Sequence, residues 1–140
     1  NLGFEQIIED YGLTDAANLA NYYAGVISLM QGKFQLAIFY FEDFSSDDIL
    51  IQPRAYSLMG DAYMELKDYE SAAKYYNKAS NYKPNKFFTP TYLMKEALAY
   101  EKLDQKEKAV LVYQKIIDEF WDSGEYQNAR KFKAKLETNS

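Results

Sequence analysis

The chain has 140 residues, the length of one domain or part of one. Its 16 Lys and Arg against 21 Asp and Glu give a net charge of −5, which argues against a nucleic-acid or anionic-membrane partner. The sequence contains no Cys and no His, so disulfides and thiolate chemistry are excluded, and the commonest general base and metal ligand is missing.

Apolar residues recur every three or four positions along most of the chain, which predicts helices and no strands. Tyr56, Gly60 and Tyr63 form one such stripe, and Ala72, Tyr76 and Ala79 extend the pattern into the next helix. Pro residues then mark the points where helices begin or end, because Pro cannot continue a helix. The expected helices span about residues 2–11, 15–31, 34–46, 53–66, 69–82, 90–103, 106–121 and 124–137.

Three segments repeat one pattern, and each is predicted to fold as two helices. They are residues 18–51, 53–86 and 90–123, with matching positions that recur after 35 and then 37 residues. Two sets of matching positions hold only small residues. A Gly inside a helix costs about 0.5–1 kcal/mol relative to Ala, so we expect close helix packing there to offset the cost. The matching residues are Gly25, Gly60 and Ala97; Ala37, Ala72 and Ala109; and Phe41, Tyr76 and Tyr113.

The residues before the first repeat and after the third repeat are predicted to extend the array of helices. Residues 4–11 echo residues 113–120, so residues 1–14 are predicted to be the second helix of a repeat whose first helix is missing. At the other end, Ser123 is predicted to cap a helix within residues 124–140, which closes the array with a polar outer face.

Aromatic residues are expected to supply much of the core. Phe87, Phe88 and Thr89 are three additional residues between the second and third repeats, and we expect a wider turn with both Phe side chains packed inward. Five aromatic residues at repeated positions are predicted to be buried, and the hydroxyl groups of the four Tyr among them are expected to reach a rim or a water molecule. They are Phe41, Tyr63, Tyr76, Tyr100 and Tyr113.

The second segment resembles the tetratricopeptide repeat family over its full length. That family asks, in order, for a large or aromatic residue, a small residue, an aromatic residue, Ala, an aromatic residue, Ala and Pro. The third segment departs at the last two positions, and the first segment is the most divergent. The resemblance implies an all-α fold, a right-handed α-α superhelix or solenoid of about eight antiparallel helices, in a single domain over residues 1–140. The matching residues of the second segment are Tyr56, Gly60, Tyr63, Ala72, Tyr76, Ala79 and Pro84.

The resemblance also implies a concave groove, lined by the first helix of each repeat, that binds a protein or peptide segment. The residues that it places there include Tyr, Met and Leu with a few mixed charges, which suits an apolar or amphipathic partner. A neighbouring repeat or a second copy of this chain covering the same surface is the alternative. The candidate partner-binding residues are Tyr22, Tyr23, Val26, Met30, Arg54, Ser57, Asp61, Glu65, Met94, Lys95 and Leu98.

The best-known groove chemistry of the family, a clamp for the C-terminal carboxylate of a peptide, is not matched. Of its five positions only Lys95 fits, and the others hold Tyr22, Val26, Leu58 and Thr91. The sequence therefore argues against a clamp of this type.

Catalytic and metal-binding patterns are scarce. No nucleotide-binding or serine-hydrolase motif occurs. The acidic residues 42–43 and 47–48 fit no EF-hand loop, so a solvated helix end is favoured over a calcium site. Asp61 and Glu65, one helical turn apart, are the only pair for a remote alternative, a carboxylate-based hydrolase. We expect no enzyme activity, no cofactor and no metal.

Two functional hypotheses remain. The first is a non-catalytic protein–protein interaction scaffold. The second is part of a membrane-tethered bacterial envelope assembly or a secretion accessory protein, because the repeats also resemble envelope proteins held by an upstream helix or lipid. The sequence shows no transmembrane segment or signal peptide, and its first residue is Asn1, so we expect a processed chain or a fragment. The expected location is the bacterial periplasm or the membrane surface, with the cytoplasm as the alternative.

Overall fold

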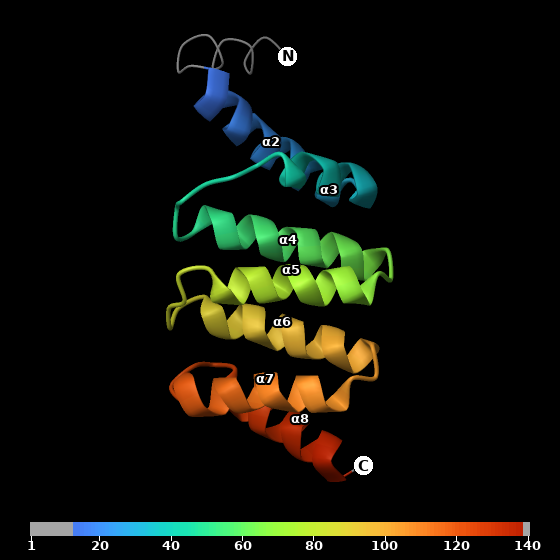
Figure 1. Cartoon of the computed structure of the whole chain (residues 1–140), viewed down its shortest axis with the longest axis vertical. Coiled ribbons are helices and arrows are strands. Elements are labelled where there is room, and N and C mark those ends of the chain that lie inside the picture. The colour runs from blue at the N-terminus through green and yellow to red at the C-terminus, as the bar shows by residue number, and fades with distance from the viewer. Residues whose placement is uncertain (1–12, 139–140) are drawn as a thin grey trace.

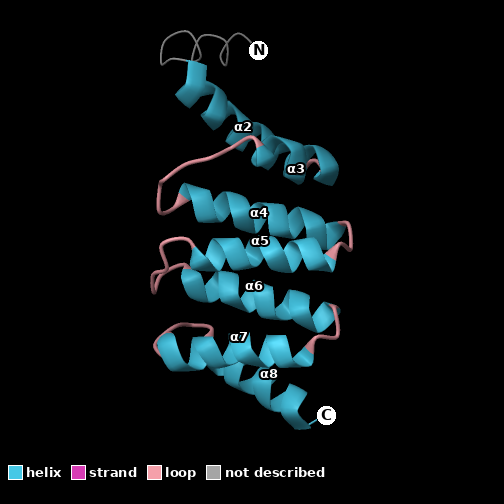
Figure 2. Cartoon of the chain, in the orientation of Figure 1, coloured by secondary structure: helices cyan, strands magenta, loops and turns pink. Residues whose placement is uncertain are grey.

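The computed structural model describes residues 13–138. Within that range the chain forms seven α-helices and no strands, which confirms the all-α prediction (Figure 2). The helix predicted over residues 2–11, in the segment 1–14, lies outside the described residues. The helices are α2 (Leu13–Met30), α3 (Phe34–Glu42), α4 (Ile51–Glu65), α5 (Tyr69–Asn81), α6 (Thr89–Lys102), α7 (Lys106–Glu119) and α8 (Tyr126–Thr138).

The helices stack one after another in chain order, so the fold is a helical repeat solenoid (Figure 1). Each helix packs against the one before it and the one after it, and α2 and α8 lie at opposite ends of the stack. Short turns join α2 to α3, α4 to α5 and α6 to α7, which makes three hairpins. In the described part of the chain, no helix combines the length and apolarity that crossing a membrane requires.

A residue with a left-handed backbone closes each of the three hairpins. Gly32, Lys67 and Asp104 stand at matching repeat positions and have φ angles of 74°, 61° and 57°. In each turn the N–H of the next residue bonds to a carbonyl five residues earlier, which satisfies the end of the first helix. These bonds run from Lys33 to Ser28 at 2.8 Å, from Asp68 to Tyr63 at 2.9 Å and from Gln105 to Tyr100 at 2.9 Å.

In the first two hairpins an aromatic ring lies directly over a glycine. A Cβ atom on Gly25 would lie 2.7 Å from the Phe41 ring, and one on Gly60 would lie 2.5 Å from the Tyr76 ring. Both rings are buried. The two helices of each hairpin thus approach closely enough that the ring occupies the space a larger residue would need, and the predicted close contacts at Gly25 and Gly60 are confirmed.

The predicted aromatic core is confirmed for three of its five members. Phe41, Tyr76 and Tyr113 are buried, whereas Tyr63 and Tyr100 are half-buried at the edge of the stack. Tyr63 stacks on the ring of Tyr75, with ring centroids 5.5 Å apart. The two partly exposed rings therefore shield the core from one side and face solvent on the other.

The prediction that Phe87 and Phe88 pack inward is wrong. Their exposed fractions are 75% and 43%. The Asn85 side-chain oxygen accepts hydrogen bonds from the N–H groups of Phe87 and Phe88, at 3.0 and 2.9 Å, and the Thr89 hydroxyl accepts one from the Asn85 N–H at 2.7 Å. Such a side-chain turn fixes the backbone before α6 and holds both rings outside the stack.

The start of α4 and the end of α3 differ from the predicted helix limits. Helix α4 begins two residues before Pro53, because an Asp48 carboxylate oxygen accepts hydrogen bonds from the N–H groups of Leu50 and Ile51. Helix α3 ends at Glu42, four residues before the predicted end, and residues 43–48 form no helix. The capping carboxylate and the early end of α3 together set the span of the connection.

The prediction that Ser123 caps α8 is wrong. Its carbonyl accepts a hydrogen bond from the Tyr126 N–H at 3.3 Å, and its own N–H donates to the Phe120 carbonyl at 3.0 Å. Its buried hydroxyl has no hydrogen-bond partner among the described residues. Ser123 is therefore part of the turn after α7, and α8 begins three residues later, at Tyr126.

One carboxyl group is buried between α5 and α6. Glu96 is 3% exposed, and it accepts hydrogen bonds from the Asn77 amide at 3.0 Å and the Ser80 hydroxyl at 3.2 Å. Burial raises the pKa of Glu96 above its usual value, because a buried carboxylate loses hydration that these hydrogen bonds do not fully replace.

Replacing Gly60 with Ala should lower the free energy of unfolding by about 1–3 kcal/mol, because the added methyl group would press into the Tyr76 ring. The matched control is Gly124→Ala, whose Cβ meets no atom within 4 Å and should change stability by less than about 0.5 kcal/mol. Urea unfolding measures both. Equal midpoints for Gly60→Ala and the wild type would contradict the packing described here.

Glu96 should make the stability depend on pH. Because its folded-state pKa is raised, the folded chain binds this proton more tightly, and stability falls as pH rises from 4.5 towards the raised value. Glu96→Gln removes the titration and keeps one of the two oxygens that accept these hydrogen bonds. We expect the variant to gain stability relative to the wild type as pH rises through this window, measured by urea unfolding. A difference that stays constant with pH would mean that burial leaves the titration of Glu96 unchanged.

Candidate partner-binding groove

The helices α2, α4 and α6, which open the three hairpins, carry every residue assigned above to partner binding; we call their shared surface the groove face. Between α4 and α6 this face sinks into a hollow of about 240 Å³, here named the α4–α6 hollow. It brings together four of the predicted residues. Its lining residues are Arg54, Ser57, Leu58 and Asp61 from α4, and Phe88, Thr91, Tyr92 and Lys95 from α6 and the residue before it.

An ion pair between α4 and α6 crosses the hollow. The Lys95 ammonium lies 2.9 and 3.1 Å from the two Asp61 carboxylate oxygens. The Tyr76 hydroxyl, from α5, donates a third hydrogen bond to Asp61 at 2.6 Å. Burial and this bond raise the pKa of Tyr76, so its hydroxyl stays protonated and acts as a donor. The Asp61 charge is therefore matched within the protein.

Arg54 is the remaining cation of the hollow. Its side chain is exposed, and no carboxylate among residues 13–138 forms an ion pair with it. It lies close enough to Tyr92 for its charge to act on that hydroxyl. Burial raises the pKa of Tyr92, and the Arg54 charge only partly opposes the rise. Arg54 and Tyr92 thus contribute a guanidinium and a protonated hydroxyl to the lining of the hollow.

The other predicted residues divide by their exposure. Tyr23 and Leu98 are 49% and 41% exposed, so they can meet a partner. Val26 and Met94 are half-buried and pack against the core clusters. Met30 and Glu65 are exposed in the last turns of α2 and α4 and do not line the hollow.

Tyr22 is a core residue, and its assignment to the groove is wrong. Only 8% of Tyr22 is exposed, and its ring packs 6.1 Å from Phe41 and 5.2 Å from Phe44, measured between ring centroids. Ser57 is also buried, although it lines the floor of the hollow. Alignment with the repeat family predicts on which helix, and in which helical turn, a residue lies. Whether the side chain of Tyr22 reaches the surface is decided by the packing of α3 against α2.

Four residues of the hollow were missing from the predicted binding residues: Leu58, Phe88, Thr91 and Tyr92. Phe88 was expected in the core, and it reaches the rim because Asn85 fixes the preceding turn. Tyr92 follows Thr91 directly, so the only signal in the sequence was its place beside a groove position.

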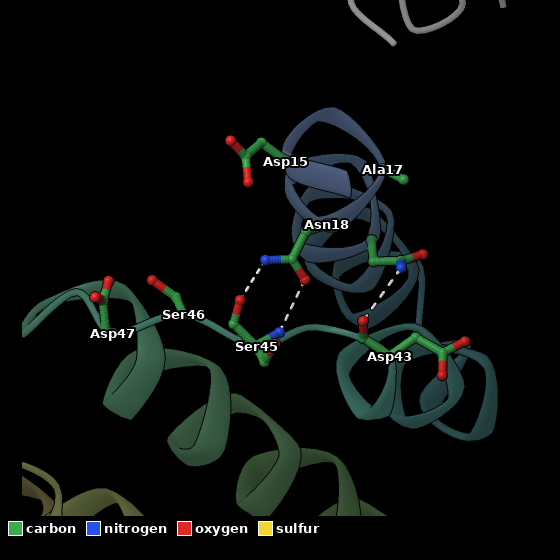
Figure 3. A pocket seen from close by; sticks show the side chains of 8 residues that line it. Asp15, Ala17, Asn18, Asp43, Ser45, Ser46 and Asp47 are labelled. Carbon is green, nitrogen blue, oxygen red and sulfur yellow. Dashed lines mark hydrogen bonds between the residues drawn. The ribbon is translucent and has the colours of Figure 1, made fainter. Parts of the chain in front are cut away.

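A second hollow, of about 720 Å³, lies between the start of α2 and the connection that follows α3 (Figure 3). The Asn18 side chain bridges to the backbone of Ser45, accepting from its N–H at 2.8 Å and donating to its carbonyl. Asp15, Asp43 and Asp47 line this hollow. No group of three His, Cys, Asp or Glu residues close enough to hold a metal ion occurs in the described part.

The carboxylate pair considered for a hydrolase is not arranged as one. Asp61 is held by Lys95 and Tyr76, while the exposed Glu65 does not line the α4–α6 hollow. Two-carboxylate hydrolysis needs both groups to face one substrate across a cleft. The charge of Asp61 instead serves the contact between α4 and α6.

Comparison with known families agrees with this architecture. Sequence models described as Tetratricopeptide repeat match residues 53–86, which hold most of α4 and all of α5, and residues 92–123, which hold most of α6 and all of α7. No curated protein matches the chain. The two matched segments, the hairpins closed over glycine and the stacked all-helical fold lead to one conclusion: the chain is a tetratricopeptide repeat protein.

Proposed function

We propose that this chain is a non-catalytic scaffold whose groove face binds a peptide or protein segment. Repeats of this family generally mediate protein–protein interactions. The observation that carries the proposal is the α4–α6 hollow, which combines an unmatched cation, an exposed aromatic ring and the half-buried side chain of Leu58 on the face expected to meet a partner.

Exposed apolar side chains extend the proposed contact beyond the hollow. Leu98 follows Lys95 by one helical turn and faces the same side of α6. On α2, Tyr23 stands at the repeat position that Leu58 and Lys95 hold in the next two repeats. Large apolar side chains exposed on one face favour burial against a partner. A bound segment would therefore run across α6, α4 and α2.

The alternative occupants of this face are a neighbouring repeat and a second copy of the chain. A second copy would bury Tyr23 and Leu98 in a dimer interface, and the mass measured in solution would then double. Light scattering coupled to gel filtration separates this case from a monomer with a free groove, and it is the first control for any binding experiment.

A membrane-tethered envelope role is a second hypothesis, and it is supported by the resemblance of residues 116–137 to envelope repeat proteins. Its test is to read the coding sequence upstream of Asn1. An apolar helix or a lipid-attachment signal there would support the hypothesis, and the absence of both would remove it.

Replacing Leu98 with Asp should weaken binding of a peptide selected from a displayed random library by about tenfold or more, because a charge would replace a buried apolar contact. The matched control is Leu111→Asp, since Leu111 is 69% exposed but lies on α7. Fluorescence anisotropy with the selected peptide measures both affinities. Full affinity in Leu98→Asp, or an equal loss in both variants, would contradict binding on the groove face.

A further inference from the structure

One of the two cations that line the α4–α6 hollow has no carboxylate partner in the described part of the chain. Asp61 and Lys95 form an ion pair at 2.9 Å, and the Tyr76 hydroxyl donates a hydrogen bond to the same Asp61 carboxylate. Arg54 has no such partner among the described residues. The hollow therefore carries an excess positive charge although the whole chain has a net charge of −5.

The donors beside this charge suit a carboxylate. The Arg54 guanidinium offers a planar fork of N–H donors that matches two carboxylate oxygens. Tyr92 keeps its proton at neutral pH, because burial raises its pKa further than the Arg54 charge lowers it. Its hydroxyl can then donate to the same anion, whereas a cationic ligand would meet Arg54 and Lys95 and be repelled.

An apolar wall stands next to these donors. Phe88 is 43% exposed and forms part of the lining, together with the half-buried Leu58. The turn that carries Phe88 is held by two hydrogen bonds to the Asn85 side chain and one to the Thr89 hydroxyl. Because the backbone that carries the ring is already held, a partner side chain that packs on Phe88 need not order this turn.

The size of the hollow limits what it can hold. Its volume of about 240 Å³ is below the roughly 300–1,000 Å³ of pockets that enclose drug-sized ligands. One or two side chains of a bound segment fill such a space. The hollow is thus a subsite within the groove face and not a site for a separate small molecule.

Resting on the proposed function, we propose that the α4–α6 hollow selects an acidic residue of the partner segment, with the Asp or Glu carboxylate on Arg54 and Tyr92 and a neighbouring apolar side chain against Phe88. Charge complementarity carries this choice, since Arg54 is unmatched while Asp61 is already neutralised. The partner recognised here is an acidic segment that also carries apolar residues.

The first test uses an array of acetylated and amidated seven-residue peptides. The central residue is Glu, Asp, Gln, Asn or Lys, and the flanking residues run through all pairs of Leu, Ile, Val, Phe and Tyr. We expect Glu and Asp peptides to bind at least about tenfold more tightly than their Gln and Asn counterparts, and Lys peptides to bind most weakly. Raising the salt concentration should reduce the preference for the acidic peptides.

Two substitutions then test the assignment with opposite signs. Arg54→Gln should remove the preference for Glu over Gln, whereas Asp61→Asn frees Lys95 and should increase it. The matched control is Arg130→Gln, because Arg130 is the other Arg of the chain and is exposed on α8. Arg130→Gln makes the same change in net charge and should leave the preference within about twofold of the wild type. Circular dichroism melting verifies that each variant is folded.

The outcomes separate this inference from the proposed function. If peptides bind with no preference for a carboxylate, or if Arg54→Gln and Arg130→Gln lose it equally, the acidic subsite is overturned while peptide binding stands. If no peptide of the array binds, the proposed function is overturned together with the subsite. An Asp61→Asn variant with a weaker preference for Glu would also contradict the charge assignment.

Discussion

The contact between Tyr76 and Gly60 joins the packing of the second hairpin to the chemistry of its surface. The ring fills the space over Gly60 where the two helices come closest, and the hydroxyl at its far end donates to Asp61. Asp61 in turn pairs with Lys95 of the next hairpin. A larger residue at position 60 would move the ring, and the carboxylate that the hydroxyl holds would move with it. The glycine therefore affects the charge pattern of the groove as well as the distance between the helices.

The same packing recurs along the stack with different polar groups. In the first hairpin the ring over the glycine belongs to Phe41, which has no hydroxyl and so holds no carboxylate. In the third hairpin Tyr113 is buried and donates to Glu101, which lies near the end of α6. The repeated backbone is thus constant while the surface charges change from one unit to the next. A solenoid can present a distinct binding surface at each repeat for this reason.

The connections between hairpins shape the rim of the groove. The turns within hairpins are tight and alike, but the connections before α4 and α6 are longer, and they touch each other. The Tyr82 hydroxyl donates to the Ser46 carbonyl at 3.0 Å, and the Lys83 ammonium donates to the Asp47 carbonyl at 2.6 Å. A few residues farther along, the Asn85 turn carries Phe88 to the edge of the α4–α6 hollow. Side-chain hydrogen bonds that fix these loops therefore prepare the surface that a partner would meet.

The sequence by itself determined the helices, the repeat and the small residues at which helices pack closely, because helical periodicity and the small positions recur within each unit. The structure added that a ring of Phe41 or Tyr76 lies over Gly25 or Gly60. The sequence also indicated which helices face a partner, through the family resemblance. Only the tertiary structure decided that Tyr22 is buried, that Phe88 is exposed and that Arg54 remains without a carboxylate among the described residues. Each of these depends on how neighbouring units sit against one another. The environment of a side chain is set by atoms that are distant along the chain, and a local sequence pattern does not predict which atoms these are.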